Sequence, residues 1–209
     1  MAHLTRAESQ ARNREALLRT ARALFLRDGF QPTSIAKIAD EAGFSTGAVY
    51  SNFSGKTELA LLVLREIEQE QLGALERLMS GPESATQKLD RFRDWAEGAL
   101  DSGWPRLELE FALEVGGDRA LVTVQTSRQH DVVNRLATAF TEQLPGDAPA
   151  GVLPIRELAD AAVTLAIGLA VRRVVDPKVS PDSVVELLRD LLSGVPGGAG
   201  LRSQGARVP

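Results

Sequence analysis

The sequence predicts an all-α fold, and three features of the chain support this prediction. Apolar residues recur at helical spacing, as Leu17, Ala21, Leu24 and Phe25 do at i, i+4, i+7 and i+8. Only one segment alternates polar and apolar residues like a strand, and no second strand exists to pair with it. Hydrophobic residues make up 44% of the 209 residues, enough to form a core. We therefore expect about nine helices and no sheet.

Two short helices are expected after the first helix, which ends at Gly29. Thr33 or Ser34 can cap the first short helix with its hydroxyl, and Gly43 closes that helix. Ser45 can cap the second short helix in the same way. Two short helices joined by a tight turn and braced by a longer one predict a helix-turn-helix motif.

Six longer helices are expected in the rest of the chain. Ser54 is expected to cap the first of them, which runs from about Lys56 to Met79. The alternating segment 107–114 is interpreted as helix, because an isolated strand has no partner for its backbone hydrogen bonds. The next helix is expected to end near Leu100, the one after it to begin near Trp104, and a third to end near Leu144. The last two are expected to cover residues 155–175 and 181–192.

Charge is unevenly distributed along the chain. The net charge is −4, but residues 1–58 carry 8 Lys and Arg against 6 Asp and Glu, a net charge of +2. A mildly basic amino-terminal segment on an acidic remainder is compatible with nucleic-acid binding by that segment alone.

Other classes of protein are disfavoured by composition. The chain has no cysteine and only two histidines, which argues against a disulfide framework and against a metal site, and we expect no cofactor. No signal peptide is visible, and the longest apolar run, 161–171, is shorter than the roughly 20 residues of a membrane span. No catalytic set of side chains stands out, so we expect a cytoplasmic protein that is not an enzyme and has no membrane partner.

The second short helix has the features of a recognition helix. Thr46, Gly47 and Tyr50 share its outer face at i, i+1 and i+4, and Ser45 adds a hydroxyl at its start. The amino-terminal residues of such a helix reach base edges in the major groove of DNA. Phosphates are expected at the starts of the neighbouring helices, at Thr33 and Ser34 and at Gly55 and Lys56, where backbone N–H groups are free.

Residues 33–59, TSIAKIADEAGFSTGAVYSNFSGKTEL, resemble the DNA-binding signature of the tetracycline-repressor (TetR) family of bacterial regulators. The resemblance covers roughly residues 10–65, and it is carried by Thr33, Ile38, Ala39, Gly43, Ser45, Tyr50, Phe53 and Lys56. It implies that Tyr50, Lys56 and Thr33 bind phosphates, that Ser45, Thr46 and Gly47 lie along bases, and that Phe53 belongs to the core.

The resemblance also implies an effector pocket between the middle helices. The candidates for its lining are aromatic or titratable side chains of those helices: Trp95, Trp104, Phe111 and His130. For each of them, ordinary core packing is the alternative.

A homodimer is expected from the last two helices. The helix 155–175 is apolar on nearly all sides, so one side is expected to be covered by its own domain and another by a second copy. A four-helix bundle across a two-fold axis would bury the predicted interface residues Leu158, Ala162, Leu165, Leu169, Val184, Leu187, Leu188 and Leu191. The alternative is a core within one chain.

Together these features predict a ligand-responsive transcription regulator, a repressor that a small-molecule effector releases from a palindromic DNA operator. The expected parts are a helix-turn-helix DNA-binding domain (1–56), a helical effector-binding and dimerisation domain (57–193) and a disordered tail (194–209). The alternative is an all-helical homodimeric module that binds a small molecule or a protein and keeps its helix-turn-helix for packing.

Overall fold

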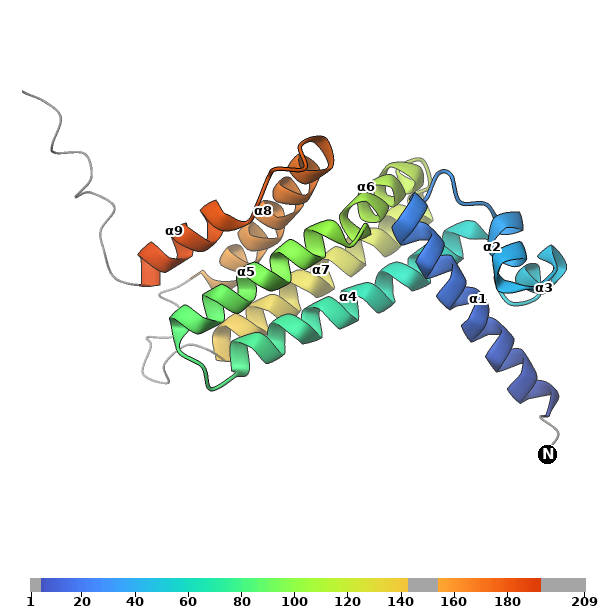
Figure 1. The fold of residues 1–209 in the computed structure, drawn as a ribbon, viewed down its shortest axis with the longest axis horizontal. Coiled ribbons are helices and arrows are strands. Elements are labelled where there is room, and N and C mark those ends of the chain that lie inside the picture. Colours follow the sequence, from blue (N-terminus) through green and yellow to red (C-terminus); the bar gives the residue numbers. More distant parts are fainter. Residues whose placement is uncertain (1–4, 143–153, 193–209) are drawn as a thin grey trace, which may run out of the picture.

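The computed structural model describes residues 5–142 and 154–192, and within these two ranges the chain forms nine α-helices and no strand (Figure 1). The helices are α1 (Arg6–Asp28), α2 (Ile35–Ala42), α3 (Thr46–Tyr50), α4 (Lys56–Ser80), α5 (Ala85–Asp101), α6 (Trp104–Val115), α7 (Arg119–Glu142), α8 (Ile155–Val175) and α9 (Asp182–Leu192). The all-α prediction is confirmed, and the alternating segment 107–114 is helical. The predicted tail 194–209 lies outside the described residues.

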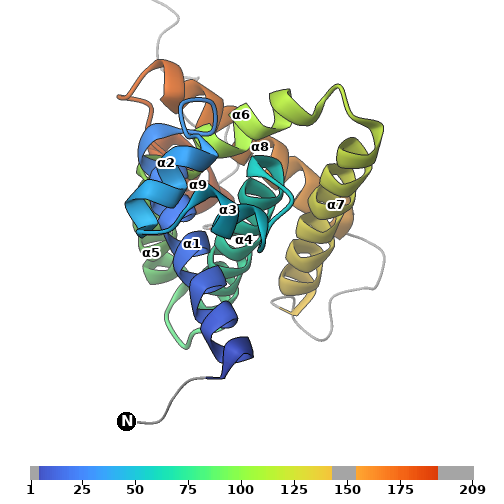
Figure 2. The same cartoon turned by 90° about the vertical axis from the view of Figure 1, so that its right-hand side faces the viewer.

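The helices form two parts, which we call the head (α1–α3) and the body (α4–α9). Figure 1 shows the head at one end of an elongated body, with α4, α5 and α7 running along its length. Helix α8 packs along α7, and α9 packs against α5, away from the head. In the end-on view of Figure 2, α2 and α3 face the viewer, so the short helices lie at the tip of the molecule.

Side chains near the helix ends determine where several helices begin. Thr5 and Glu8 form a capping box at the start of α1, and Ser84 and Gln87 form another at α5. The prediction that Ser54 caps α4 is wrong, because the N-cap is Gly55 and makes no side-chain hydrogen bond. Ser54 instead donates its backbone N–H and its hydroxyl to the carboxylate of Glu58, at 2.6 and 2.8 Å.

One hydrophobic core joins the head to the body. The predicted stripe of α1 is buried, together with Ile38 and Val49 of the short helices. The same core continues into α4 and α6, where its members are Leu59, Ala60, Val63, Leu64, Ile67, Leu107, Phe111 and Val115. A second core, formed by Leu72, Val133, Leu136 and Ala159, lies further along the body. The expected boundary between the two domains lies at residue 56, and the first core contains residues from both sides of it. The head is therefore packed directly onto α4 and α6.

Helix α6 begins in direct contact with the end of α1. Gly103, its N-cap, has φ = 81°, and a β-carbon there would lie 2.1 Å from the carbonyl oxygen of Leu26. Only glycine tolerates both the left-handed backbone and this close approach. The start of α6 is therefore fixed on the head.

Candidate nucleic-acid interface

Helix α3 presents a small exposed surface on a buried anchor. Ser45 caps it by accepting a hydrogen bond from the N–H of Ala48, at 3.2 Å, as predicted. Val49 is fully buried and holds the helix on the core. The side chains of Ser45, Thr46 and Tyr50 are exposed, as is Gly47, and 61% of Tyr50 is accessible to solvent. The single tyrosine of the chain therefore lies on the outside of the predicted recognition helix.

The residues after α3 hold it in place. Phe53 is buried, as expected, and Arg14 of α1 lies over its ring at 4.2 Å. Arg14 also donates a hydrogen bond to the carbonyl of Asn52. These contacts give Arg14 a structural role in the head. Arg6 and Arg12, at the start of α1, are exposed.

Ser34 and Thr33 lie differently at the start of α2. Ser34 is the N-cap and accepts from the N–H of Lys37, so the hydroxyl of Ser34 lies exposed at the helix amino terminus. Thr33 is only 1% exposed, its hydroxyl donates to the carbonyl of Gly29 at 2.8 Å, and its N–H donates to Phe30. Both donors of Thr33 are thus used inside the head, and the phosphate contact predicted there requires at least one of them to change its partner.

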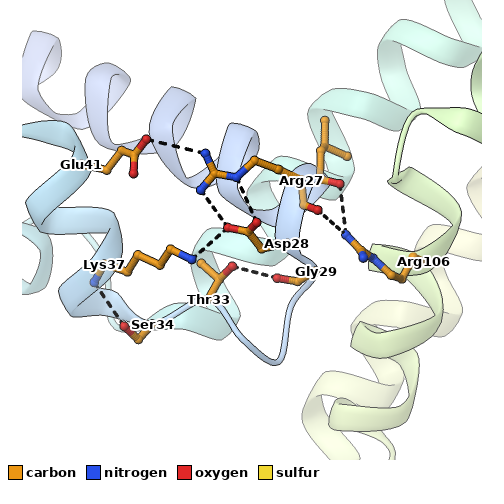
Figure 3. Close-up of polar contacts among 9 residues, drawn as sticks. Arg27, Asp28, Gly29, Thr33, Ser34, Lys37, Glu41 and Arg106 are labelled. Atoms are coloured by element: carbon orange, nitrogen blue, oxygen red, sulfur yellow. Dashed lines mark hydrogen bonds and ion pairs between the residues drawn. The ribbon is translucent and has the colours of Figure 1, made fainter.

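An ion-pair network binds α1 to α2 (Figure 3). The carboxylate of Asp28 accepts from Arg27 and from Lys37, each at 2.9 Å, and Arg27 also lies 3.8 Å from Glu41. These hydrogen bonds hold the pKa of Asp28 well below its ordinary value, chiefly through the bond from Arg27. The network neutralises two of the basic residues of the head, so Arg27 and Lys37 are poor candidates for phosphate binding.

Lys56 begins α4 and is turned toward the head. Its ammonium donates to the carbonyl oxygens of Phe30 and Gln31, at 2.9 and 3.4 Å, and lies 4.0 Å from the centre of the Phe30 ring. Partial burial lowers the pKa of Lys56, and the nearby carboxylates of Glu114 and Glu110 oppose that lowering. A phosphate contact by Lys56, as predicted, requires this ammonium to exchange its carbonyl partners for DNA.

Four residues that the sequence did not indicate connect the head to α6. Gln31 donates to the carboxylates of Glu110 and Glu114, and Arg106 donates to the carbonyls of Leu26 and Arg27 (Figure 3 shows Arg106). About 80 residues separate these partners along the chain. No pattern of residues close in sequence could have predicted these pairs. The charged residues of α6 were the only sign in the sequence that this helix has polar partners.

The four expected pocket residues do not gather in one place. Phe111 is buried in the core shared with the head, where its ring meets Phe30 edge-on at 5.9 Å, and Trp104 packs against that core. The rings of Trp95 and Phe92 lie 5.6 Å apart at a tilt of 33°, and His130 is exposed. Phe111 thus belongs to the core and His130 faces solvent, so the described structure does not bring these two side chains together around one pocket.

A cavity of about 300 Å³ lies instead between α4 and α7. It is lined by Arg65, Glu68, Gln69, Val124, Ser127, Arg128 and Asp131. Arg128 is 7% exposed and forms ion pairs with Glu68, at 2.8 Å, and with Glu108. Burial raises the pKa of Glu68, against the opposing effect of Arg128. Most of the residues around it are polar and carry both signs of charge.

Helices α8 and α9 expose apolar side chains in the single chain. Leu158, Leu165 and Leu187 are 47–57% exposed, whereas Ala162, Leu169, Val184 and Leu188 are half-buried. The side chain of Leu191 lies outside the described part of the structure. Further exposed apolar residues on α8 are Ile167, Val171, Val174 and Val175. So much apolar surface on one helix is unusual for a monomer.

Residues 5–142 and 154–192 contain no group of three or more His, Cys, Asp or Glu side chains that could hold a metal ion. Among the helices described, none is both long and apolar enough to cross a membrane.

Comparison with known proteins identifies the head. Residues 17–63 match the sequence model of the family described as bacterial regulatory proteins, tetR family. The HTH-type transcriptional repressor KstR2 of Mycolicibacterium smegmatis is 30% identical over 79 residues, which are 38% of this chain and 38% of that protein. The chain thus aligns with less than two fifths of the length of the curated relatives it matches.

Solved structures extend the likeness in fold to the body. A TetR-family transcriptional regulator from Pectobacterium atrosepticum superposes with a TM-score of 0.69 at 24% identity, covering 91% of this chain and 97% of the other. SmeT, solved in complex with triclosan, superposes with a TM-score of 0.60 at 20% identity, covering 95% and 99%. The helix-turn-helix of this chain, within residues 17–63, thus matches the model of the tetR family of bacterial regulatory proteins, and the fold of the chain is similar to that of solved regulators of this family.

Proposed function

We propose that this protein is a DNA-binding transcriptional repressor that acts as a homodimer and responds to a small-molecule effector. The observation that carries the proposal is the exposed surface of α3. This surface is formed by Ser45, Thr46, Gly47 and Tyr50, and the buried Val49 anchors the helix to the core. A rigid helix that presents small polar side chains at its amino-terminal end fits the major groove. The match of residues 17–63 to a family of bacterial regulators supports the same role.

The residues divide into two kinds of DNA contact. Ser45, Thr46 and Gly47 stand at the amino-terminal end of α3 and would lie along base edges. Tyr50, with its exposed phenol, and Ser34, at the start of α2, would bind phosphates and fix the position of the head on DNA. Lys56 would add a charged phosphate contact after leaving the carbonyls of Phe30 and Gln31.

Dimerisation would bring two heads to one operator. The exposed leucines of α8 and α9 supply the apolar surface, and these helices lie away from α3 (Figure 1), so two copies could pair there without covering the heads. A two-fold dimer would read a pseudo-palindrome with half-sites about 34–36 Å apart, one turn of DNA, or a multiple of that distance. A cytoplasmic location belongs to the same proposal.

The effector would act through the body. The polar cavity between α4 and α7 is one place where a ligand could bind, and α4 carries Lys56 at its start. The structure of SmeT with triclosan supports a ligand site in a body of this fold. A coupling of about 1–3 kcal/mol between effector and operator is typical of such switches, and linkage makes it equal in both directions.

The proposal is tested by selecting DNA fragments from the source genome with the purified protein. Wild-type protein is expected to enrich fragments that share a pseudo-palindrome. The matched control is Thr46→Glu, in which a carboxylate at the start of α3 suits the helix dipole and preserves the fold but repels DNA. Enrichment by the wild type and not by the control supports the proposal. No enrichment by a folded wild-type dimer would overturn it and favour a module that binds a ligand or a protein.

A further inference from the structure

Gln31 lies where the head meets α6, and it is bound from two sides. From α6, the carboxylate of Glu110 accepts its backbone N–H at 3.0 Å, and the carboxylate of Glu114 accepts its side-chain amide at 2.8 Å. From α4, the ammonium of Lys56 donates to its carbonyl oxygen at 3.4 Å. One residue of the α1–α2 loop thus stands between a cation and two anions.

Glu110 lies against bare backbone of the head. A β-carbon on Gly29, which has φ = 93°, would lie 2.7 Å from the Oε1 atom of Glu110, so the carboxylate occupies space that a side chain at position 29 would need. Arg106, one turn earlier on α6, lies 3.8 Å from the same oxygen. A movement of α6 would therefore change the position of this carboxylate relative to the loop.

These carboxylates act on Lys56 across the loop. The ammonium is partly buried over the Phe30 ring, and burial disfavours its charge. Glu114 and Glu110 offset part of this cost, so their charges favour the inward position of Lys56. The carbonyls of Phe30 and Gln31 complete the site with two hydrogen bonds.

We propose that Glu110 and Glu114 of α6 are an internal counter-charge that competes with an operator phosphate for Lys56. This inference rests on the proposed DNA-binding function and adds a regulatory contact to it. In the arrangement described here Lys56 faces the loop, and DNA binding must draw the ammonium away from the field of two carboxylates. Because both carboxylates stand on α6, a displacement of α6 changes how strongly they compete. The body can thus set the affinity of the head without touching α3.

The test is a double-mutant cycle on operator binding. The variant Glu110→Gln/Glu114→Gln removes both charges but keeps an amide oxygen that accepts from Gln31. Lys56→Met removes the cation and keeps an unbranched side chain beside the Phe30 ring. The wild type, the two variants and their combination are titrated with a labelled operator by fluorescence anisotropy, after circular dichroism has shown that each is folded.

With Lys56 present, the glutamine substitutions are expected to raise operator affinity about three- to tenfold, and in the Lys56→Met background about twofold or less. An equal gain in both backgrounds would mean that the substitutions only relieve a general repulsion between carboxylates and DNA. That result would overturn the inference. So would the absence of any gain.

Glu41→Gln is the matched control, because Glu41 is an exposed carboxylate of the head that pairs with Arg27. Its effect on affinity is expected to be the same with and without Lys56. If the wild type binds no DNA fragment, the proposed function fails and the inference with it. If the wild type binds an operator and the cycle shows no coupling, only the inference fails.

Discussion

The guanidinium of Arg106 on α6 donates a hydrogen bond of 2.8 Å to the backbone carbonyl of Arg27 at the end of α1, and one of 3.3 Å to Leu26 (Figure 3). The last carbonyls of a helix have no partner within it, and a cation there also complements the helix dipole. Gly103 lies against the same carbonyl of Leu26. The head is thus held by the first turn of α6, and a movement of α6 must reach it.

Gly103→Ala should destabilise the protein by about 2 kcal/mol or more, because the new β-carbon meets both a left-handed backbone and the Leu26 carbonyl. Urea denaturation followed by circular dichroism measures this change. Gly98→Ala is the control, since Gly98 lies within α5 with no neighbouring atom within 4 Å of a new β-carbon. That substitution should stabilise by up to about 1 kcal/mol. Equal effects at both positions would contradict the packing of α6 on α1.

Tyr50→Phe should weaken operator binding by about 1 kcal/mol, roughly fivefold, because it removes one hydrogen bond to a phosphate. The loss should be similar for operator and unrelated DNA, since a phosphate carries no sequence information. The melting temperature should be unchanged, because the side chain is 61% exposed. Thr138→Val, at an exposed position of α7, should alter neither property. Full affinity of the Phe variant would remove the phenol of Tyr50 from the interface.

Asp28→Asn should lower stability at neutral pH, and its cost should disappear in acid. The folded-state pKa of Asp28 lies below its unfolded value, so its contribution is complete above the unfolded pKa of about 3.9 and is lost as pH falls through the folded value. Urea midpoints of wild type and variant should therefore begin to converge below about pH 4 and continue to do so as the pH falls toward the folded value. Asp40→Asn is the control, an exposed residue of α2. A gap that does not narrow below about pH 4 would show that the Asp28 network is not what stabilises the contact of α1 with α2.

Arg128→Met should destabilise by about 3–5 kcal/mol, because it leaves the carboxylates of Glu68 and Glu108 partly buried without their cation. Arg135→Met breaks a comparable pair with Glu76, at 2.7 Å, in which both side chains are about 40% exposed. That pair should contribute less than about 1 kcal/mol. Thermal unfolding of the two variants separates a buried network from a surface one, and similar melting temperatures would contradict the burial of Arg128.

Leu165→Glu should convert the proposed dimer to monomers, since it places a charge on the exposed apolar face of α8. Leu113→Glu on α6 is the matched control, because Leu113 is 75% exposed but lies outside α8 and α9. Light scattering should report a monomer for the first variant and a dimer for the second. A dimer that survives Leu165→Glu would place the interface elsewhere.

Local patterns predicted most of the fold. The stripe from Leu17 to Phe25, the cap at Ser45 and the glycine that closes α2 each depend on residues within two turns, and the structure has all three. The error at Ser54 is of the same local kind, because a glutamate in the first turn of α4 reached back and took the hydroxyl as its donor.

The site was predictable only in part. The exposure of α3 follows from the periodicity of its own residues. The inward position of Lys56 depends on Phe30, and the hydrogen bonds of Gln31 depend on two glutamates about 80 residues away. Thr33 and Phe111 are both buried, which their residue types did not indicate. A polar or aromatic type indicates what a side chain can bind, whereas packing between distant helices decides whether it is free to bind it.

The most direct test of the central claim is the salt dependence of binding to the tightest selected DNA fragment. The logarithm of the affinity should fall linearly with the logarithm of salt concentration, by about 0.9 for each phosphate neutralised, and the wild-type slope should correspond to several phosphates. A folded dimer that binds no fragment, or whose affinity is the same at about 50 and 200 mM salt, would show that the exposed surface of α3 does not bind the DNA backbone.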